Sequence, residues 1–252
     1  MISNLRMVRP CHSKIHSINT KNADCIDYSL FGDLKGKRVL HLQSLLGTES
    51  IEFAKAGAKV TAVECSEPLI MWAKEICKSY DVEPEFILSD IQDLSVNVTG
   101  EYDIIFSSYG SLSWIPDMPD FFQSIYNLLA PGGEFVLTEL HPFMKMSQTL
   151  FSQVDYQYFS DEYRIKSNVT TELCSAETEF LPGVFLNSPL KDVFSLLLGL
   201  GFDISKFTEY QSTPFDIMDG VVEFLPGKYK TEDDNAEMPL TFSLVAVKNT
   251  DA

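Results

Sequence analysis

Hydrophobic residues follow two alternating patterns from residue 37 onward. Short, almost continuously apolar runs alternate with longer segments whose apolar residues recur every three or four positions. The first pattern is typical of buried strands and the second of amphipathic helices. We therefore predict helices at residues 48–56, 67–80 and 118–129, and five strands, at Val39–Leu42, Lys59–Glu64, Glu85–Ser89, Tyr102–Phe106 and Phe135–Leu140. This alternation indicates a parallel sheet with helices on both faces.

The end of the chain departs from this alternation. A helix is predicted at Leu190–Leu200, and the segments Phe202–Tyr210 and Leu240–Val247 are strand candidates with no helical pattern between them. We expect these two strands to pair antiparallel at the edge of the sheet. The predicted fold is a single Rossmann-like, doubly wound α/β domain over residues 37–252, with a seven-stranded sheet and an antiparallel last strand. Residues 1–36 are predicted to form an N-terminal arm that acts as a lid.

Candidate binding residues lie where the predicted strands end, which is where doubly wound sheets bind ligands. Glu64 is placed to accept both hydroxyls of a ribose, and Asp90 to bind the exocyclic amine of an adenine. Each feature alone also fits a plain turn, a solvated strand end or a capping Asp, but together they favour a nucleoside site. The candidate cofactor-binding residues are Gln43, Gly47, Glu64, Cys65, Asp90, Ile91 and Ser107.

The first of these turns differs from a dinucleotide-binding loop. Such a loop has the pattern G-x-G-x-x-G, because a pyrophosphate needs several unobstructed backbone N–H groups. Here the turn reads QSLLG, with Gln43 and Leu45 where glycines would be required. The pattern disfavours NAD and FAD, and an NAD-linked reductase with them. A ligand that has an amino-acid end and no phosphate makes a milder demand on the turn.

Five segments resemble, in order and spacing, the successive motifs of class I S-adenosylmethionine-dependent methyltransferases. They are VLHLQSLLGTES, VTAVECS, SDIQDL, YDIIFSSYGSLSWIPD and LLAPGGEFVLTELHPF, over roughly residues 37–142, and the strand TFSLVAVK matches the closing hairpin of the family. The resemblance implies that the first loop cradles the methionine part of the cofactor. It also implies that Glu64 holds the ribose, that Asp90 and Ile91 meet the adenine, and that Ser107 lies beside the methionine.

The resemblance has departures that bear on activity. The usual Asp of the first motif is His41, and two of its glycines are Gln43 and Leu45. Loops reading HLQ are similar to those of bacterial small-molecule methyltransferases. The departures also leave open a protein that binds the cofactor without using it.

The amino-acid composition of the chain limits the classes of binding partner that we expect. The chain has 36 acidic and 19 basic residues and a net charge of -17, which disfavours nucleic acid and favours a neutral or cationic substrate. Five scattered cysteines predict reduced thiols and a cytoplasmic protein. No apolar run has the length of a membrane span, and no signal core is evident, so no membrane partner is expected. No metal is expected, and the neighbouring Cys11, His12 and His16 are interpreted as incidental.

The chemical class of the methyl acceptor is inferred from residues 143–189. This segment is an insertion after the fifth strand that we expect to cover the substrate site. Its acidic and aromatic residues, including Asp161 and Tyr158, suit an ammonium or guanidinium group, as do Tyr109 and Trp114 beside the crevice. Asp161 is thus one catalytic candidate. His141 is the other, as the base that an alcohol or phenol would need, although a structural role is the stronger interpretation.

We therefore predict a monomeric or homodimeric enzyme that N-methylates a small molecule or modified peptide, with small-molecule O-methylation as the alternative. The acidic aromatic insertion is also faintly similar to methyltransferases that dimethylate the N-terminal arginine of thiazole/oxazole peptide antibiotics such as plantazolicin. That similarity implies a place in antibiotic biosynthesis.

Overall fold

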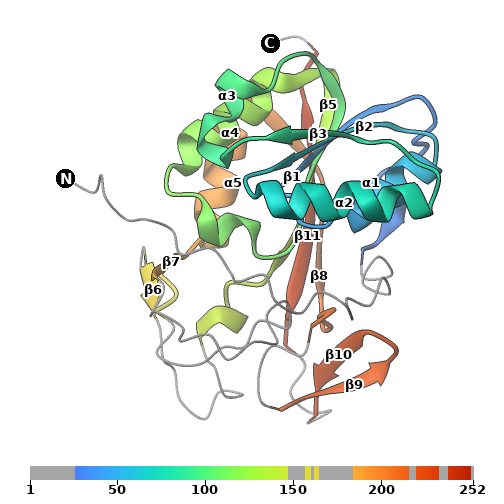
Figure 1. Ribbon diagram of the computed structural model, residues 1–252. Helices are drawn as coiled ribbons and strands as arrows, with labels where there is room; N and C mark the ends of the chain where they lie inside the picture. Colours follow the sequence, from blue (N-terminus) through green and yellow to red (C-terminus); the bar gives the residue numbers. More distant parts are fainter. Residues whose placement is uncertain are drawn as a thin grey trace.

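The computed structural model describes residues 26–146, 157–159, 162–164, 184–215, 220–232 and 238–250. Its centre is a seven-stranded sheet in the order β3-β2-β1-β4-β5-β11-β8 (Figure 1). β11 is antiparallel to both of its neighbours, β5 and β8, whereas the other pairs are parallel. The strands are β1 (Arg38–Leu42), β2 (Lys59–Glu64), β3 (Glu85–Leu88), β4 (Tyr102–Ser107), β5 (Leu129–Leu140), β8 (Phe202–Tyr210) and β11 (Thr241–Lys248). The predicted sheet and its antiparallel last strand are confirmed.

Helices cover both faces of the sheet (Figure 1). They are α1 (Thr48–Lys55), α2 (Glu67–Ser79), α3 (Leu94–Asn97), α4 (Met118–Leu128) and α5 (Leu190–Gly199). One buried cluster joins the sheet to α3, α4 and α5, with Leu40 and Leu42 of β1 in it. A second cluster joins Val39, on the opposite face of the same strand, to Phe53 of α1. The alternation of buried side chains along β1 thus places the two helical layers.

Residues before β1 belong to this second cluster. A 3-10 turn, η2 (Tyr28–Leu30), places Leu30, Phe31 and Leu34 in buried positions, and the Phe31 ring lies edge-on to that of Phe53 with centroids 4.9 Å apart. The described part of the expected N-terminal arm is therefore packed into the core. Residues 1–25, which include Cys11, His12 and His16, lie outside the described residues, so the lid stays a prediction.

The junction between α4 and β5 differs from the expected one. Asp117 begins the helix by accepting a hydrogen bond from the amide of Asp120 at 3.0 Å. The helix ends at Leu128 and the strand starts at once at Leu129, which we had assigned to the helix. Lys248 explains the abrupt change, because its Nζ donates to the carbonyl oxygens of Tyr126 and Leu129, each at 2.8 Å. A cation there satisfies carbonyls that the helix leaves free.

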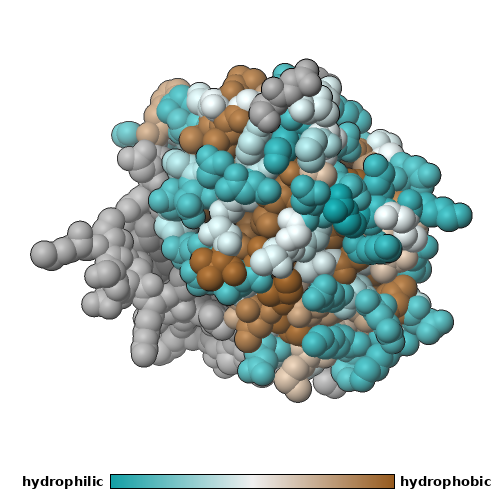
Figure 2. Space-filling model, turned by 90° about the horizontal axis from the view of Figure 1, so that it is seen from above, coloured by the Kyte–Doolittle hydropathy of each residue, from teal (hydrophilic) through white to brown (hydrophobic). Residues whose placement is uncertain are grey.

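Two short antiparallel ribbons complete the description. β9 (Val221–Leu225) pairs with β10 (Lys228–Thr231), and both lie between β8 and β11 in the sequence. The sequence pattern does not indicate this ribbon. β6 (Glu162–Arg164) pairs with β7 (Val184–Leu186) within the predicted insertion. None of the described helices is both long and apolar enough to cross a membrane. Hydrophilic side chains cover much of the face seen from above, with hydrophobic areas between them (Figure 2).

Candidate functional site

The strand order reverses between β1 and β4, and the loops that leave these two strands meet at the carboxyl edge of the sheet. The side-chain amide of Gln43, directly after β1, donates to the carbonyl of Ser111, in the turn after β4, at 3.5 Å. Such a switch point is the usual ligand position of an open α/β sheet. The structure therefore brings together the loop after the first strand and the segment after the fourth strand, both of which the sequence indicated.

The loop after β1 has the backbone of a glycine loop without its glycines. Gln43, Leu45 and Gly47 have φ values of 51°, 49° and 69°. Positive φ is unfavourable for the first two, because a Cβ crowds the backbone in the left-handed region. At Gly47, an added Cβ would lie 3.2 Å from the ring of Phe86. The loop thus turns sharply and leads into the N-terminus of α1, as a ligand-cradling loop does.

Glu64, the last residue of β2, holds this loop. Its Oε2 accepts a hydrogen bond from the amide of Leu45 at 3.0 Å, and its Oε1 accepts one from the amide of Ser66 at 2.9 Å. Glu64 is 4% exposed, and its burial raises the pKa of the carboxyl group despite these bonds and further ones from the amide and thiol of Cys65. The protein therefore already supplies donors to both carboxylate oxygens.

A cavity of about 400 Å³ opens beside Glu64, at the ends of β2 and β3. It is lined by Cys65, Glu67, Leu88, Ser89, Asp90, Asp93 and Asn97. Oδ1 of Asp90 accepts the amide of Gln92 at 3.1 Å and so caps the 3-10 turn η3 (Ile91–Asp93), in which Ile91 is buried. The capping role that the sequence left open is therefore real, and it leaves the other oxygen of Asp90 for a ligand. The size of the cavity is within the range of small-molecule sites.

The end of β4 is the remaining part of the candidate site, and it lies on the other side of β1 from this cavity. Ser107 is buried, and its hydroxyl donates to the hydroxyl of Ser111 at 2.8 Å. Ser111 belongs to a 3-10 turn, η4 (Ser111–Trp114), which ends on Trp114, a partly exposed side chain. The ring of Tyr109 lies edge-on to that of Phe215, with centroids 5.5 Å apart. Two of the predicted substrate residues thus occupy this one segment after β4.

Glu139, a buried carboxylate near the end of β5, is a further residue of the candidate site that the sequence pattern does not indicate. It accepts hydrogen bonds from the amides of Gly110, Leu112 and Leu140 at 2.6, 3.0 and 2.7 Å. The only available signal was an acidic residue near the end of a central strand in the segment VLTELHPF.

His141 follows β5. Nδ1 accepts the amide of Phe143 at 3.1 Å, and Nε2 lies 3.0 Å from Oε1 of Glu209 without the alignment of a hydrogen bond. A neutral ring with Nδ1 as acceptor carries its proton on Nε2, so neither nitrogen is a free acceptor. This geometry agrees with the structural interpretation that the sequence left beside the catalytic one.

The insertion is described only in part. Tyr158 lies at the start of α5, where its carbonyl accepts a bond from the side-chain amide of Asn187 at 2.7 Å and its hydroxyl accepts the amide of Leu190 at 3.3 Å. β7 contacts η4, so this part of the insertion lies against the turn that ends on Trp114. Asp161 lies outside the described residues. Within the described part of the chain, no cluster of three or more His, Cys, Asp or Glu side chains could hold a metal.

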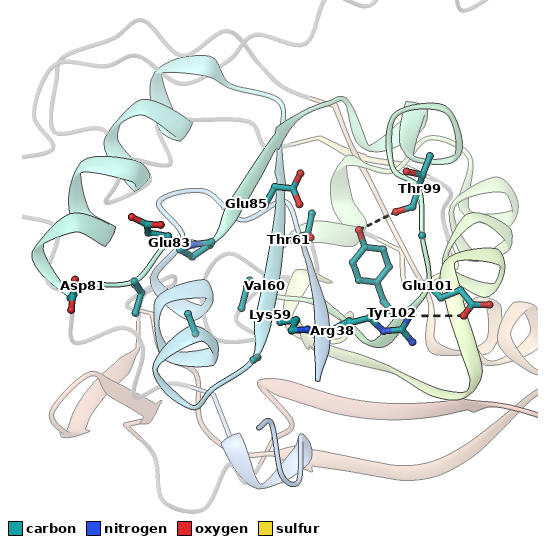
Figure 3. A pocket seen from close by; sticks show the side chains of 15 residues that line it. Arg38, Lys59, Val60, Thr61, Asp81, Glu83, Glu85, Thr99, Glu101 and Tyr102 are labelled. Atoms are coloured by element: carbon teal, nitrogen blue, oxygen red, sulfur yellow. Dashed lines mark hydrogen bonds and ion pairs between the residues drawn. The ribbon is translucent and has the colours of Figure 1, made fainter. Parts of the chain in front are cut away.

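A second, larger cavity lies at the opposite edge of the sheet. It measures about 720 Å³ and is lined by the amino ends of β1 to β4, including Arg38, Lys59 and Glu85 (Figure 3). The Arg38 guanidinium is already paired, at 2.8 Å from Asp103 and 3.9 Å from Glu101. Because ligands of such sheets bind at the carboxyl edge, we place the candidate site in the smaller cavity.

Comparison with known proteins shows which domains the chain is similar to. Residues 39–133 match the family model described as a methyltransferase domain. A ubiquinone biosynthesis O-methyltransferase of Xanthomonas oryzae pv. oryzae is 28% identical over 127 residues, which are 50% of this chain and 52% of that relative. The chain thus spans about half the length of this curated relative.

Two solved structures show the fold. An S-adenosylmethionine dependent methyltransferase from Mesorhizobium loti has a TM-score of 0.63 at 18% identity, with 87% of this chain and 94% of that chain covered. The glycopeptide N-methyltransferase MtfA has a TM-score of 0.58 at 16% identity, with 93% and 92% covered. The chain therefore has the Rossmann-like fold of methyltransferases, as the sequence motifs implied.

Proposed function

We propose that a chain with this fold and this matching segment is an S-adenosylmethionine-dependent methyltransferase that N-methylates a small molecule or modified peptide. The observation that carries the proposal is the left-handed loop at the switch point, held by Glu64 next to a cavity of nucleoside size. The loop keeps the backbone of a methionine-cradling turn although Gln43 and Leu45 replace its glycines.

The residues at the strand ends fit the cofactor. Glu64, whose carboxylate also holds the loop, accepts the ribose hydroxyls. Asp90 offers its second oxygen to the adenine amine, with Ile91 against the ring. Gln43, Gly47 and Ser107 surround the methionine end, and Cys65 lines the same cavity. Bound there, S-adenosylmethionine supplies a methyl group on a sulfonium, which is an excellent leaving group. The protein's task is then to align the acceptor with that methyl group in a dry site.

An amine is the acceptor whose methylation needs the fewest catalytic groups from these side chains. A neutral amine attacks without a base, whereas an alcohol or phenol requires one. His141 is already an acceptor at Nδ1 and faces Glu209 at Nε2. Asp161, Tyr158, Tyr109 and Trp114 belong to the proposal as the residues that receive a cationic acceptor.

The second candidate function is O-methylation, which the curated relative, a ubiquinone biosynthesis O-methyltransferase, favours. A protein that binds the cofactor without using it is a third. N-terminal dimethylation of a modified peptide is the narrowest form of the first candidate. Cytoplasmic location, a monomeric or homodimeric state and the absence of nucleic-acid and membrane partners are further parts of the same proposal.

Ligand-induced stabilisation tests the cofactor first. S-adenosylhomocysteine at 100 times its Kd should stabilise the fold by about 2.7 kcal/mol, because it binds only the folded state. It should therefore raise the melting temperature, whereas NADH should not. The reverse result would replace the methyltransferase with a reductase. Transfer of label from S-adenosylmethionine to paired amine and phenol acceptors, read by mass spectrometry, then separates N-methylation, O-methylation and binding alone.

A further inference from the structure

Glu139 is a charged side chain in an unusual position. It lies one residue before the end of β5, is 1% exposed, and pairs through its backbone with Phe242 of the neighbouring β11. The ion pairs of the described residues do not include it. A carboxylate buried without a cation is costly unless hydrogen bonds replace its water, so its hydrogen-bond partners explain why it is tolerated there.

Those partners come mainly from one segment, residues 107–114, which we call the wall segment. Oε1 accepts the amides of Gly110 and Leu140 at 2.6 and 2.7 Å. Oε2 accepts the amide of Leu112 at 3.0 Å and a longer bond from the Ser111 hydroxyl at 3.5 Å. Four donors fill the acceptor positions of the carboxylate. Glu139 is therefore satisfied by the protein and is not available as a base or a ligand for substrate.

The wall segment lies between the proposed cofactor loop after β1 and the proposed substrate side, which carries Tyr109 and Trp114. On one side, the carbonyl of Ser111 accepts the side-chain amide of Gln43, from the loop after β1. On the other side, the segment carries Tyr109 and Trp114, and its turn η4 contacts β7 of the insertion. Gly110 has φ 80°, so the segment turns sharply at the residue that Glu139 holds.

We propose that Glu139 is a positioning residue that fixes the wall segment, and through it the place of the methyl acceptor relative to the cofactor loop. We call the hydrogen bonds from Gly110, Ser111 and Leu112 to Glu139 the clamp. The effect of the clamp on catalysis rests on the proposed function, whereas the clamp itself does not. Glu139→Gln is the matched probe, because an amide keeps the shape and turns an N–H₂ group toward backbone donors that need an acceptor. Glu139→Asp keeps the charge and shortens its reach.

Site-resolved amide hydrogen exchange tests the clamp. In Glu139→Gln, we expect exchange at Gly110 and Leu112 to accelerate at least tenfold, while the amides of Val136 and Leu244 in the sheet stay within threefold. Glu139→Asp should fall between wild type and Glu139→Gln, and Glu134→Gln, halfway along β5, should match wild type. Uniform acceleration across the sheet, or no change at Gly110 and Leu112, would overturn the clamp.

Kinetics test its catalytic consequence. Glu139→Gln should lower kcat at least tenfold while the Kd of S-adenosylhomocysteine stays within threefold, and Glu139→Asp should recover part of the loss. A fall in kcat that only tracks the folded fraction would overturn the positioning role. If Glu139→Gln does not fold, Gly110→Ala serves instead, because an added Cβ meets no atom within 4 Å but disfavours the positive φ. If wild type binds no cofactor yet the local exchange changes, the proposed function fails and the clamp stands.

Discussion

The carboxylate of Glu64 accepts a hydrogen bond from the backbone amide of Leu45, a non-glycine residue held at φ 49°, over a distance of 3.0 Å. The end of β2 thus fixes the loop after β1 in a conformation that its own sequence disfavours. Strain of this kind costs about 1–3 kcal/mol per residue and persists only where surrounding contacts impose it. Glu64 therefore holds the loop beside the proposed ligand site.

Glu64→Gln should weaken cofactor binding. The neutral amide loses a charged acceptor for the ribose, and hydrogen bonds to charged groups contribute about 1.5–3 kcal/mol. We expect the Kd of S-adenosylhomocysteine to rise at least about fivefold, which corresponds to about 1 kcal/mol. Isothermal titration calorimetry measures it. Glu67→Gln, on an exposed side chain lining the same cavity, is the control and should stay within about twofold. Equal affinities for wild type and Glu64→Gln would remove this residue from the ribose role.

Leu45→Gly should cost little stability. Glycine relieves the left-handed strain, about 1–2 kcal/mol, and loses about 0.4–1 kcal/mol through the greater freedom of the unfolded chain. Met71→Gly, inside α2, is the control, since both side chains are largely exposed, at 45% and 62%. Glycine inside a helix costs about 1 kcal/mol. Urea unfolding should therefore show Met71→Gly to be the more destabilising by at least about 1 kcal/mol. Equal losses would show that the positive φ of Leu45 stores no strain.

Much of the fold could be predicted because its signals are local. The apolar runs of β1, β2 and β4 are buried on both faces, so they read as strands without help from distant residues. The start of β5 could not be placed in this way. Leu128 and Leu129 are equally apolar, and the Lys248 side chain that bonds the carbonyls of Tyr126 and Leu129 around the change from helix to strand comes from a segment about 120 residues later.

In the candidate site too, features set by local sequence could be predicted, whereas features set by distant residues could not. The strand ends located Glu64 and Asp90, because a parallel sheet brings its carboxyl ends to one edge. The sequence suggested that Gln43 and Leu45 break the glycine loop, whereas both residues have positive φ. The contact that imposes this on Leu45 comes from Glu64, 19 positions away. Glu139 escaped notice for the same reason, since its donors lie 27 to 29 residues earlier, except Leu140.

His41 should make stability depend on pH. Burial lowers its pKa to about 3 from the model-peptide value of 6.5, and its Nδ1 is 2.8 Å from the hydroxyl of Ser50. The unfolded chain binds a proton below pH 6.5 that the folded chain excludes, so stability is full above 6.5 and falls as pH decreases toward 3. Between pH 7 and pH 5, we expect this one group to cost about 2 kcal/mol.

Chemical unfolding at a series of pH values measures this dependence. His41→Asn removes the titrating group, so its stability should fall less steeply with decreasing pH than that of wild type. Ser50→Ala is the control, because it removes the hydrogen bond and leaves the buried ring, and it should keep the wild-type slope. Parallel curves for wild type and His41→Asn would contradict the assignment of the lost proton to His41.

His141→Ala should leave methyl transfer to an amine almost unchanged. Since Nδ1 accepts the amide of Phe143 and Nε2 faces Glu209, the ring has no free acceptor position for a substrate proton. Transfer to an amine should therefore keep kcat/KM within about threefold, whereas loss of a true general base would cost about 10²–10⁴. Amine and phenol acceptors on one carbon skeleton provide the measurement. Glu209→Gln, which keeps the ring and removes its anionic neighbour, controls for displacement of His141. A loss above about 100-fold with the amine would make His141 catalytic after all, because an acceptor that needs no base would then depend on one.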